Sequence, residues 1–266
     1  MKLITSVENQ IYKTAVQLKQ KKYRDEQKRY LIEGPNLICE ALNHGGEIEM
    51  ILSREDYYDE DLNCGGTGLA QAGAGVAVLS SGLFRKLSDT ETPQGIMAIV
   101  KKRVYSEEEF FAPGFPNIIV LDRLQDPGNI GTILRTADAA GYMGAIILKG
   151  TADIYSPKIV RATAGSLFRL PVLMADTPGQ VIRLLKEHKK NIICTTPNCS
   201  RFYYDTDLKE NAAIIIGNEG NGVCDEFLKD SDTLIKIPME GTIESLNAAV
   251  SAGILMYESV RQKYQK

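Results

Sequence analysis

Short apolar runs alternate with helical patterns through the second half of the chain, and this alternation restricts the fold more than any other feature. Strands that alternate with helices form a mainly parallel sheet whose two faces the helices cover. The sequence therefore predicts an α/β domain, and the ligands of such a sheet bind beyond the carboxyl ends of its strands. The predicted strands are 117–122, 144–149, 171–175, 191–195, 212–217 and 233–238, and the predicted helices are 128–140, 157–166, 178–189, 222–230 and 245–263.

The first half predicts a smaller α/β domain. Its expected end lies at the segment RVYSEEEFFAPGFP, which is charged and then rich in proline and glycine, as is typical of a domain boundary. The expected division is a first domain at 1–102, a linker at 103–116 and a second domain at 117–266. The expected elements of the first domain are a helix from a T-x-x-E capping box at Thr5 and Glu8 to about Lys22, strands at 29–32, 48–52, 76–79 and 95–100, a helix at 35–42, and a glycine-rich connection from Cys64 to Gly75.

Composition excludes several classes of protein. No apolar run approaches the roughly 18 residues of a membrane-spanning helix, and the N-terminus MKLITSVENQ lacks the apolar core of a signal peptide. We therefore expect a cytoplasmic protein that does not enter the membrane. The five cysteines form no CxxC pair, so we expect reduced thiols and no metal site. Neither histidine, His44 or His188, has the serine or cysteine context of a catalytic triad.

Charge is distributed unevenly. A net charge of −3 argues against a protein that coats polyanions over its whole surface. Residues 1–30, however, hold eight Lys and Arg side chains against three acidic ones. Charge alone favours a solvated helix face here over a nucleic-acid contact, and both interpretations stay open.

The stretch LDRLQDPGNIGTILRTADAAG, from Leu121 to Gly141, predicts a strand, a tight turn and a helix. Asn129 lies at the start of that helix, whose apolar positions recur with helical spacing. Arg135 lies five residues after Ile130, at about 100° per residue, so it projects roughly opposite the apolar stripe. An ordinary crossover helix requires neither that asparagine nor that arginine.

A glycine-rich loop, GNEGNG at 217–222, follows a late predicted strand. Its glycines let the backbone bend sharply and approach a ligand closely. The pattern differs from both dinucleotide-binding and P-loop motifs, and alone it is equally typical of a turn that caps a helix. Glu219 is the unusual member, because a simple turn needs no carboxylate.

A third polar loop, IPMEGTIESLN at 237–247, leads into the last helix. Ser245 is the expected N-cap, and Asn247 is a poor helix former inside the expected first turn. Gly253 costs about 1 kcal/mol in mid-helix relative to alanine, which indicates close packing against a second subunit or within the chain. The expected buried stripe comprises Leu246, Ala249, Val250, Gly253, Ile254 and Tyr257.

Taken together, these three loops resemble the motifs of the SpoU family of SPOUT-class RNA 2′-O-ribose methyltransferases, the TrmH-like enzymes. The motifs are N-x-G-x-x-x-R-T-A from Asn129, I-I-G-N-E-G-x-G-V from Ile215, and I-P-M-x-G-x-x-E-S-L-N-A-A from Ile237. The segments YLIEGPNLICEAL and LSDTETPQGIMAIV are similar, less sharply, to the substrate-binding domain that often precedes this catalytic domain.

The resemblance implies a fold and partners that spacing does not reveal. It implies a C-terminal α/β knot, in which the parallel sheet is trefoil-knotted, and a smaller N-terminal α/β domain of the ribosomal-protein L30e type that binds RNA. It also implies the cofactor S-adenosylmethionine and a homodimer with the last helix and the first-motif helix at its interface.

The resemblance also assigns residues. It implies a catalytic set of Asn129, Arg135, Glu219, Ser245 and Asn247, and cofactor contacts at Gly217, Ile237 and Leu246. An arginine with a pKa above about 12 is a poor base, so we expect Arg135 to clamp a phosphate and stabilise the developing alkoxide. An RNA substrate also favours phosphate contacts by the basic N-terminal segment, at Arg24, Lys28 and Arg29.

The choice of RNA rests on analogy. Ribosomal RNA is favoured over transfer RNA because a separate N-terminal domain is more typical of the ribosomal-RNA members. The alternatives are a tRNA methyltransferase, a non-catalytic RNA-binding or ribosome-assembly factor, and a nucleotide-dependent α/β enzyme that uses the GNEGNG loop.

Overall fold

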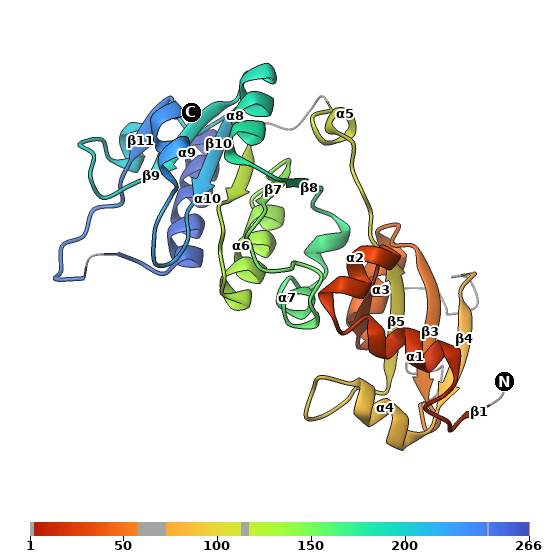
Figure 1. The fold of residues 1–266 in the computed structure, drawn as a ribbon. Helices are drawn as coiled ribbons and strands as arrows, with labels where there is room; N and C mark the ends of the chain where they lie inside the picture. The colour runs from red at the N-terminus through yellow and green to blue at the C-terminus, as the bar shows by residue number, and fades with distance from the viewer. Residues whose placement is uncertain (1–2, 58–72, 113–116, 244, 266) are drawn as a thin grey trace. The chain divides into compact units, whose positions relative to one another are not determined.

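The computed structural model describes residues 3–57, 73–112, 117–243 and 245–265, and its chain divides into two compact units (Figure 1). Unit 1 consists of Met1–Arg103 together with Asp153–Arg169. Unit 2 consists of Val104–Ala152 together with Leu170–Lys266. The segment Asp153–Arg169 was expected in the second domain, but its contacts place it in unit 1.

Unit 2 is built on a parallel sheet with the strand order β11-β9-β10-β6-β7-β8. Its central strands are continuous apolar runs that are buried along their whole length, as expected for strands covered on both faces. The parallel α/β architecture predicted from the sequence is confirmed. The strands are β6 (Ile118–Leu121), β7 (Gly144–Leu148), β8 (Val172–Ala175), β9 (Asn191–Thr195), β10 (Ala212–Ile216) and β11 (Thr233–Ile235).

The helices of unit 2 follow the predicted pattern closely. Asp126 caps α6 by accepting a hydrogen bond from the backbone N–H of Asn129, and proline occupies the first turn. Helix α10 packs against α6, and its Gln262 is hydrogen-bonded to the backbone of Thr206 and Leu208. The helices are α5 (Glu107–Phe110), α6 (Pro127–Ala139), α8 (Pro178–Glu187), α9 (Asp225–Asp230) and α10 (Ala248–Tyr264).

Unit 1 contains a mixed sheet with the order β1-β4-β3-β5-β2. The capping box predicted at Thr5 and Glu8 is wrong, because Asn9 caps the first helix by accepting from the N–H of Ile11, and that helix ends at Gln17 before a second one begins. The elements are β1 (Leu3–Ile4), α1 (Gln10–Gln17), α2 (Lys21–Gln27), β2 (Arg29–Glu33), α3 (Pro35–Asn43), β3 (Ile48–Arg54), β4 (Gly75–Leu79), α4 (Ser81–Leu87), β5 (Ile96–Lys101) and α7 (Pro157–Ala162). Most of the glycine-rich connection lies outside the described residues.

The segment Asp153–Arg169 is held in unit 1 by apolar contacts and by a buried ion pair. Val160 and Phe168 belong to the core that surrounds β2 and α3. Arg24 is 4% exposed, and its guanidinium donates to Asp153 at 2.6 and 2.8 Å. The same guanidinium also donates to two backbone carbonyls at 2.7 Å. Four of its five N–H groups are thus used inside the protein, so the structure gives Arg24 an intramolecular role in place of the expected RNA contact.

The cysteines differ from expectation at one position. Cys194, Cys199 and Cys224 are free thiols, as predicted. Cys39 is disulfide-bonded, so the prediction of a reduced thiol is wrong for this residue. Cys64 lies outside the described residues. Among the described residues, no helix is both long and apolar enough to cross a membrane.

Candidate active site at the carboxyl ends of the parallel strands

The three polar loops leave the same edge of the unit 2 sheet. Strands β6 and β10 are parallel neighbours, with Leu121 opposite Ile216, so the loops that follow them start side by side. Strand β11 runs parallel to β9, which itself borders β10, and its carboxyl end therefore lies at the same edge. Ligands of parallel α/β sheets bind at such an edge.

Glu219 joins the second loop to the first. Its carboxylate accepts hydrogen bonds from the backbone N–H groups of Gln125 and Asp126, at 3.1 and 3.0 Å, and from the side chain of Asn129 at 3.1 Å. Burial opposes ionisation, but the backbone hydrogen bonds from Asp126 and Gln125 outweigh it and lower the pKa of Glu219. Glu219 is therefore an ionised acceptor that fixes two loops together.

Asn129 and Asn247 extend this connection to the third loop. Asn247 donates from its side-chain amide to Asn129 Oδ1 at 2.8 Å, and Asn129 donates in turn to Glu219. Asn247 Oδ1 accepts from the N–H groups of Ala249 and Val250 and so caps α10. Three residues from the three motifs thus form one directed hydrogen-bond chain, which we call the Asn247–Asn129–Glu219 chain.

A second set of polar contacts, not found from the sequence, ties the same loops together. Asp122 is fully buried, pairs with Arg123 at 2.6 Å, and accepts from the N–H of Cys224 at 2.8 Å. Asn218 donates to the carbonyl of Arg123 at 2.8 Å. The available signal was a single aspartate that directly follows a buried strand.

The GNEGNG loop closes on itself. Backbone hydrogen bonds join Asn218 and Gly222 in both directions, at 3.0 and 2.9 Å. A Cβ at Gly217 would lie 2.2 Å from the backbone of Gly222 and Val223. Only glycine fits at position 217, and the reason is closure of the loop itself.

The structure does not bring every predicted residue into this cluster. Arg135 is exposed on α6, about 9 Å along the helix axis from Asn129, and no described contact joins the two. Ser245 and Leu246 are also exposed, and the prediction of Ser245 as N-cap is wrong because Asn247 takes that position. Ile237 is partly buried in the third loop.

Helix α10 has two apolar faces. The face that packs within the chain carries Ala249, Ala252, Leu255 and Met256. Of the stripe predicted to be buried, Ala249 alone is buried, whereas Val250 is 50% and Tyr257 is 52% exposed. A Cβ at Gly253 would meet no described atom within 4 Å, so packing inside the described chain does not explain this glycine.

The basic residues predicted for RNA have different environments in unit 1. Lys28 is exposed and adopts a left-handed backbone conformation at the end of α2. Arg29 pairs with Glu49 at 2.6 Å, and its side chain remains 38% exposed.

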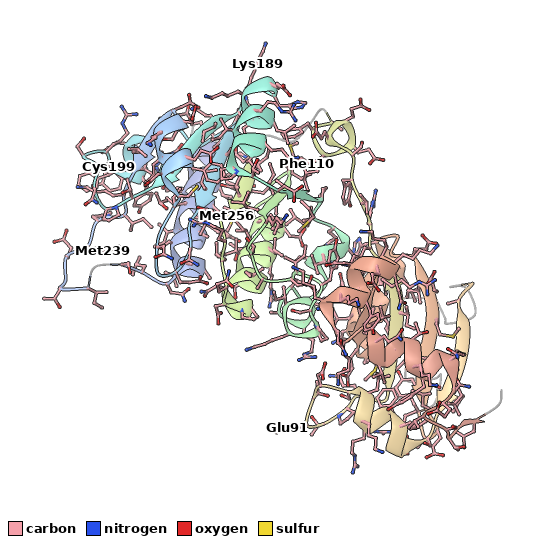
Figure 2. All side chains as sticks on the ribbon, in the orientation of Figure 1. Glu91, Phe110, Lys189, Cys199, Met239 and Met256 are labelled. Atoms are coloured by element: carbon pink, nitrogen blue, oxygen red, sulfur yellow. The ribbon has the colours of Figure 1, made fainter. Side chains whose placement is uncertain are left out.

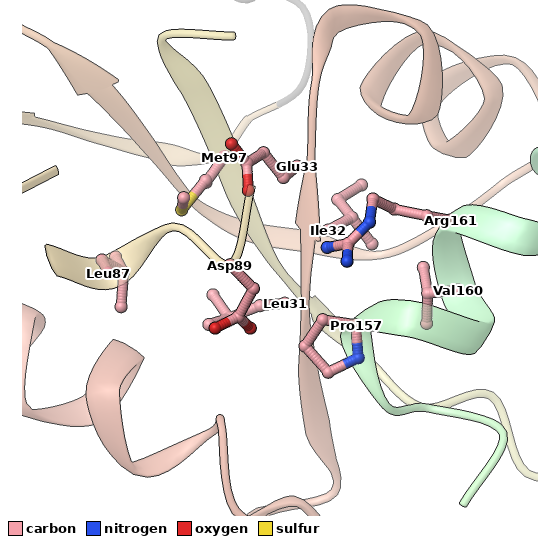
Figure 3. Close-up of a pocket in the computed structure, with 9 residues that line it drawn as sticks. All are labelled: Leu31, Ile32, Glu33, Leu87, Asp89, Met97, Pro157, Val160 and Arg161. Atoms are coloured by element: carbon pink, nitrogen blue, oxygen red, sulfur yellow. The ribbon is translucent and has the colours of Figure 1, made fainter. Parts of the chain in front are cut away.

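A small cavity lies in unit 1 between β2, β5 and α7 (Figure 3). Its volume is about 20 Å³, which is enough for roughly one water molecule. Arg161, Glu33 and Asp89 supply its charged lining. The cavity is too small for a nucleoside-sized ligand.

The lowered pKa of Glu219 gives a testable pH dependence. A carboxylate with a lowered folded-state pKa stabilises the loops above its unfolded pKa, and this stabilisation is lost as pH falls through the folded pKa. We expect cofactor affinity, measured by calorimetry, to stay constant from neutral to mildly acidic pH and to fall only below the ordinary pKa of a glutamate side chain, because the pKa of Glu219 is lowered. Glu219→Gln should weaken the affinity at neutral pH and remove this acidic fall. An unchanged acidic fall in Glu219→Gln would contradict this assignment.

Both halves of the chain match known protein families. The model of the SpoU rRNA methylase family matches residues 116–257, and that of the MRM3-like substrate binding domain matches residues 9–98. The chain is 36% identical to the 23S rRNA (guanosine(2553)-2′-O)-methyltransferase RlmP of Bacillus subtilis, over 97% of this chain and 98% of that protein. It is 30% identical to the 23S rRNA (uridine(2479)-2′-O)-methyltransferase of Streptomyces viridochromogenes, over 88% and 83% of the two chains. A crystal structure of an AdoMet-bound rRNA methyltransferase from Sinorhizobium meliloti superposes with a TM-score of 0.88 at 32% identity, covering 99% of both chains.

Proposed function

The chain belongs to the SpoU rRNA methylase family, and we propose that it methylates a ribose 2′-OH of ribosomal RNA with S-adenosylmethionine as donor. The observation that carries this proposal is the Asn247–Asn129–Glu219 chain, which links all three motifs at the ligand-binding edge of the sheet. A non-catalytic protein that only binds RNA would not require the Asn247–Asn129–Glu219 chain.

The loops at this edge suit the cofactor. Backbone groups at Gly217, Ile237 and Leu246 would hold S-adenosylmethionine, because they belong to loops that leave the strand edge beside the polar cluster. When bound, the cofactor supplies an electrophilic methyl group. The residues of the chain then have to position a ribose hydroxyl and manage its proton.

Each polar residue has a separate task in this scheme. Glu219 accepts three hydrogen bonds and holds the first two loops in place. Asn129 and Asn247 each retain one amide hydrogen beyond the bond described, with which they orient the RNA. Arg135 and Ser245 are exposed and free to contact the substrate, Arg135 by clamping a phosphate and stabilising the alkoxide as it forms.

A homodimer would complete the site. The outer face of α10 presents Val250, Ile254 and Tyr257 around the open Gly253, which is a surface suited to a second copy of this helix. In such a dimer, Arg135 of one subunit would serve the cofactor pocket of its partner. This accounts for its separation from Asn129 within one chain.

A charge on this outer face should separate the subunits. Gly253→Glu would bury a carboxylate in the interface, so we expect a monomer by light scattering and a near-complete loss of methyl transfer. Lys263→Glu, on the exposed end of the same helix, is the matched control and should remain dimeric. A dimeric Gly253→Glu protein would place the interface elsewhere.

Unit 1 would bind RNA outside the methylated ribose. Its match to a substrate-binding domain supports this role, and the exposed Lys28 and the half-exposed Arg29 remain its candidate phosphate contacts. Ribosomal RNA as substrate implies that the protein works in the cytoplasm.

The decisive experiment is mass-spectrometric mapping of 2′-O-methylated nucleotides in cells with and without the protein. We expect one ribosomal-RNA methylation to disappear on deletion and to return with the wild-type protein but not with Asn129→Ala. Loss of a tRNA methylation instead would reassign the substrate. Failure of the purified protein to bind S-adenosylmethionine by calorimetry would overturn the proposal.

A further inference from the structure

A cluster of aromatic and basic side chains lies beside the end of β11, where the chain leads into the third motif loop. The segment Arg201–Tyr204 pairs with Lys236, one residue before the cofactor-loop position Ile237. Phe202 and Tyr204 are stacked with ring centroids 5.3 Å apart, and Tyr203 meets Tyr204 edge-on at 5.2 Å. We call these residues the aromatic platform.

The platform is held rigidly by the backbone. Tyr203 donates its N–H to the carbonyl of Lys236, and Lys236 donates to the carbonyl of Arg201, both at 3.0 Å. Gln262 of α10 holds the next turn by donating to Thr206 at 2.9 Å. The rings are therefore preorganised, and a ligand that stacks on them has little ordering entropy to overcome.

The backbone of the platform meets the chain at Lys236, directly after the carboxyl end of β11. Strand β9, which leads into it, runs parallel to β11, and Thr196 donates to the carbonyl of Ile235 at the carboxyl end of that strand. Figure 2 labels Cys199 of the β9 loop and Met239 of the third motif loop at the same end of unit 2.

Its chemistry fits an unpaired nucleotide. Tyr204 is 47% exposed, which leaves part of its ring open to a base. Lys236 Nζ lies 5.2 Å from the centroid of Phe202, and the exposed Arg201 precedes Phe202 in the chain, so one cation contacts the rings and a second is adjacent in sequence. Asp205 carries the opposite charge after Tyr204, which places phosphates at the Arg201 and Lys236 end.

We propose that the aromatic platform binds an unpaired nucleotide of the substrate RNA, whose base stacks on Tyr204 and whose phosphate contacts Arg201 and Lys236. This inference rests on the proposed function, because it assumes an RNA substrate at this edge. Base–aromatic stacking tolerates any base, so the platform would hold a nucleotide near the target without reading its identity.

The test measures binding of two fluorescein-labelled ten-nucleotide probes to the full-length protein by anisotropy. One probe is oligo(A) RNA and the other is the same ribose-phosphate chain without bases. We expect Tyr204→Ala to weaken oligo(A) binding about tenfold and to leave binding of the base-free chain unchanged, whereas Tyr204→Phe keeps wild-type affinity. Lys236→Gln should lower the slope of log affinity against log salt by about 0.7 for one lost phosphate contact.

Met174→Ala is the control, since Met174 is an apolar side chain 56% exposed on β8, at the opposite edge of the sheet. If Tyr204→Ala and the wild-type protein bind oligo(A) with equal affinity, the proposal that the aromatic platform stacks on a base is wrong. A shift of Tyr204→Ala from dimer to monomer would also overturn it, since a second copy would then cover the rings. Wild-type protein that binds no RNA at all would instead contradict the proposed function, which separates the two failures.

Discussion

Arg135→Ala is expected to lower kcat for methyl transfer by about a thousandfold while the protein remains folded and binds S-adenosylmethionine normally. Removing one group that stabilises developing charge typically lowers kcat by about 10²–10³-fold. Arg135 is proposed both to bind a phosphate and to stabilise the alkoxide, so we expect a loss at the upper end of this range. Arg135 is exposed, so its removal leaves no cavity in the described structure. The measurement is single-turnover transfer of a radiolabelled methyl group to RNA, with cofactor affinity from calorimetry.

Two comparisons make this result specific. Thr132→Ala changes an exposed residue on the same helix and should retain wild-type kcat. Mixing Arg135→Ala with Asn247→Ala protomers should restore about a quarter of the activity, because half of randomly paired dimers are mixed and each mixed dimer regains one of its two sites. Full activity in Arg135→Ala alone would remove this residue from the mechanism.

Arg24→Met is expected to destabilise the protein by about 3–5 kcal/mol. The substitution leaves the largely buried Asp153 without the partner that donates to it at 2.6 Å, and an uncompensated buried charge carries a cost of this size. Two backbone carbonyls also lose their donor. Urea unfolding followed by circular dichroism measures the change.

The double variant Arg24→Met with Asp153→Leu should recover most of that stability, because removing both charges leaves neither unpaired. Lys22→Ala is the matched control on the same helix, since its pair with Glu26 is exposed and 3.9 Å long and should contribute below about 1 kcal/mol. A double variant no more stable than Arg24→Met would show that the lost carbonyl contacts, and not the charge, carry the effect.

The parallel sheet and the three motifs could be predicted from the sequence because their signals are local. Each central strand is one apolar run, and each polar loop directly follows a strand. The N-cap of α10 was harder to predict from the sequence, because serine and asparagine are equally good N-cap residues. The structure shows that Asn247, and not Ser245, takes this position. The knot implied by the family resemblance stays a prediction.

Long-range pairing and the two apolar faces of α10 account for the remaining differences. The pair of Arg24 with Asp153 joins residues 129 positions apart, so an arginine in a basic segment looked like an RNA contact. Helix α10 carries apolar residues on two faces, and periodicity does not say which one its own chain covers. The predicted stripe at Val250 and Tyr257 belongs to the face that this chain leaves open.

The placement of Asp153–Arg169 in unit 1 means that the chain passes between the two units three times, at 103/104, 152/153 and 169/170. The N-terminal unit is therefore not a module that a single recombination event could exchange. In a chimera that replaces residues 1–103 alone, Val160 and Phe168 would lose the apolar side chains against which they pack. Asp153 would lose its ion pair with Arg24. Grafting a new RNA-binding unit onto this enzyme requires two matched segments, so the substrate-binding half and the Asp153–Arg169 crossover have to change together.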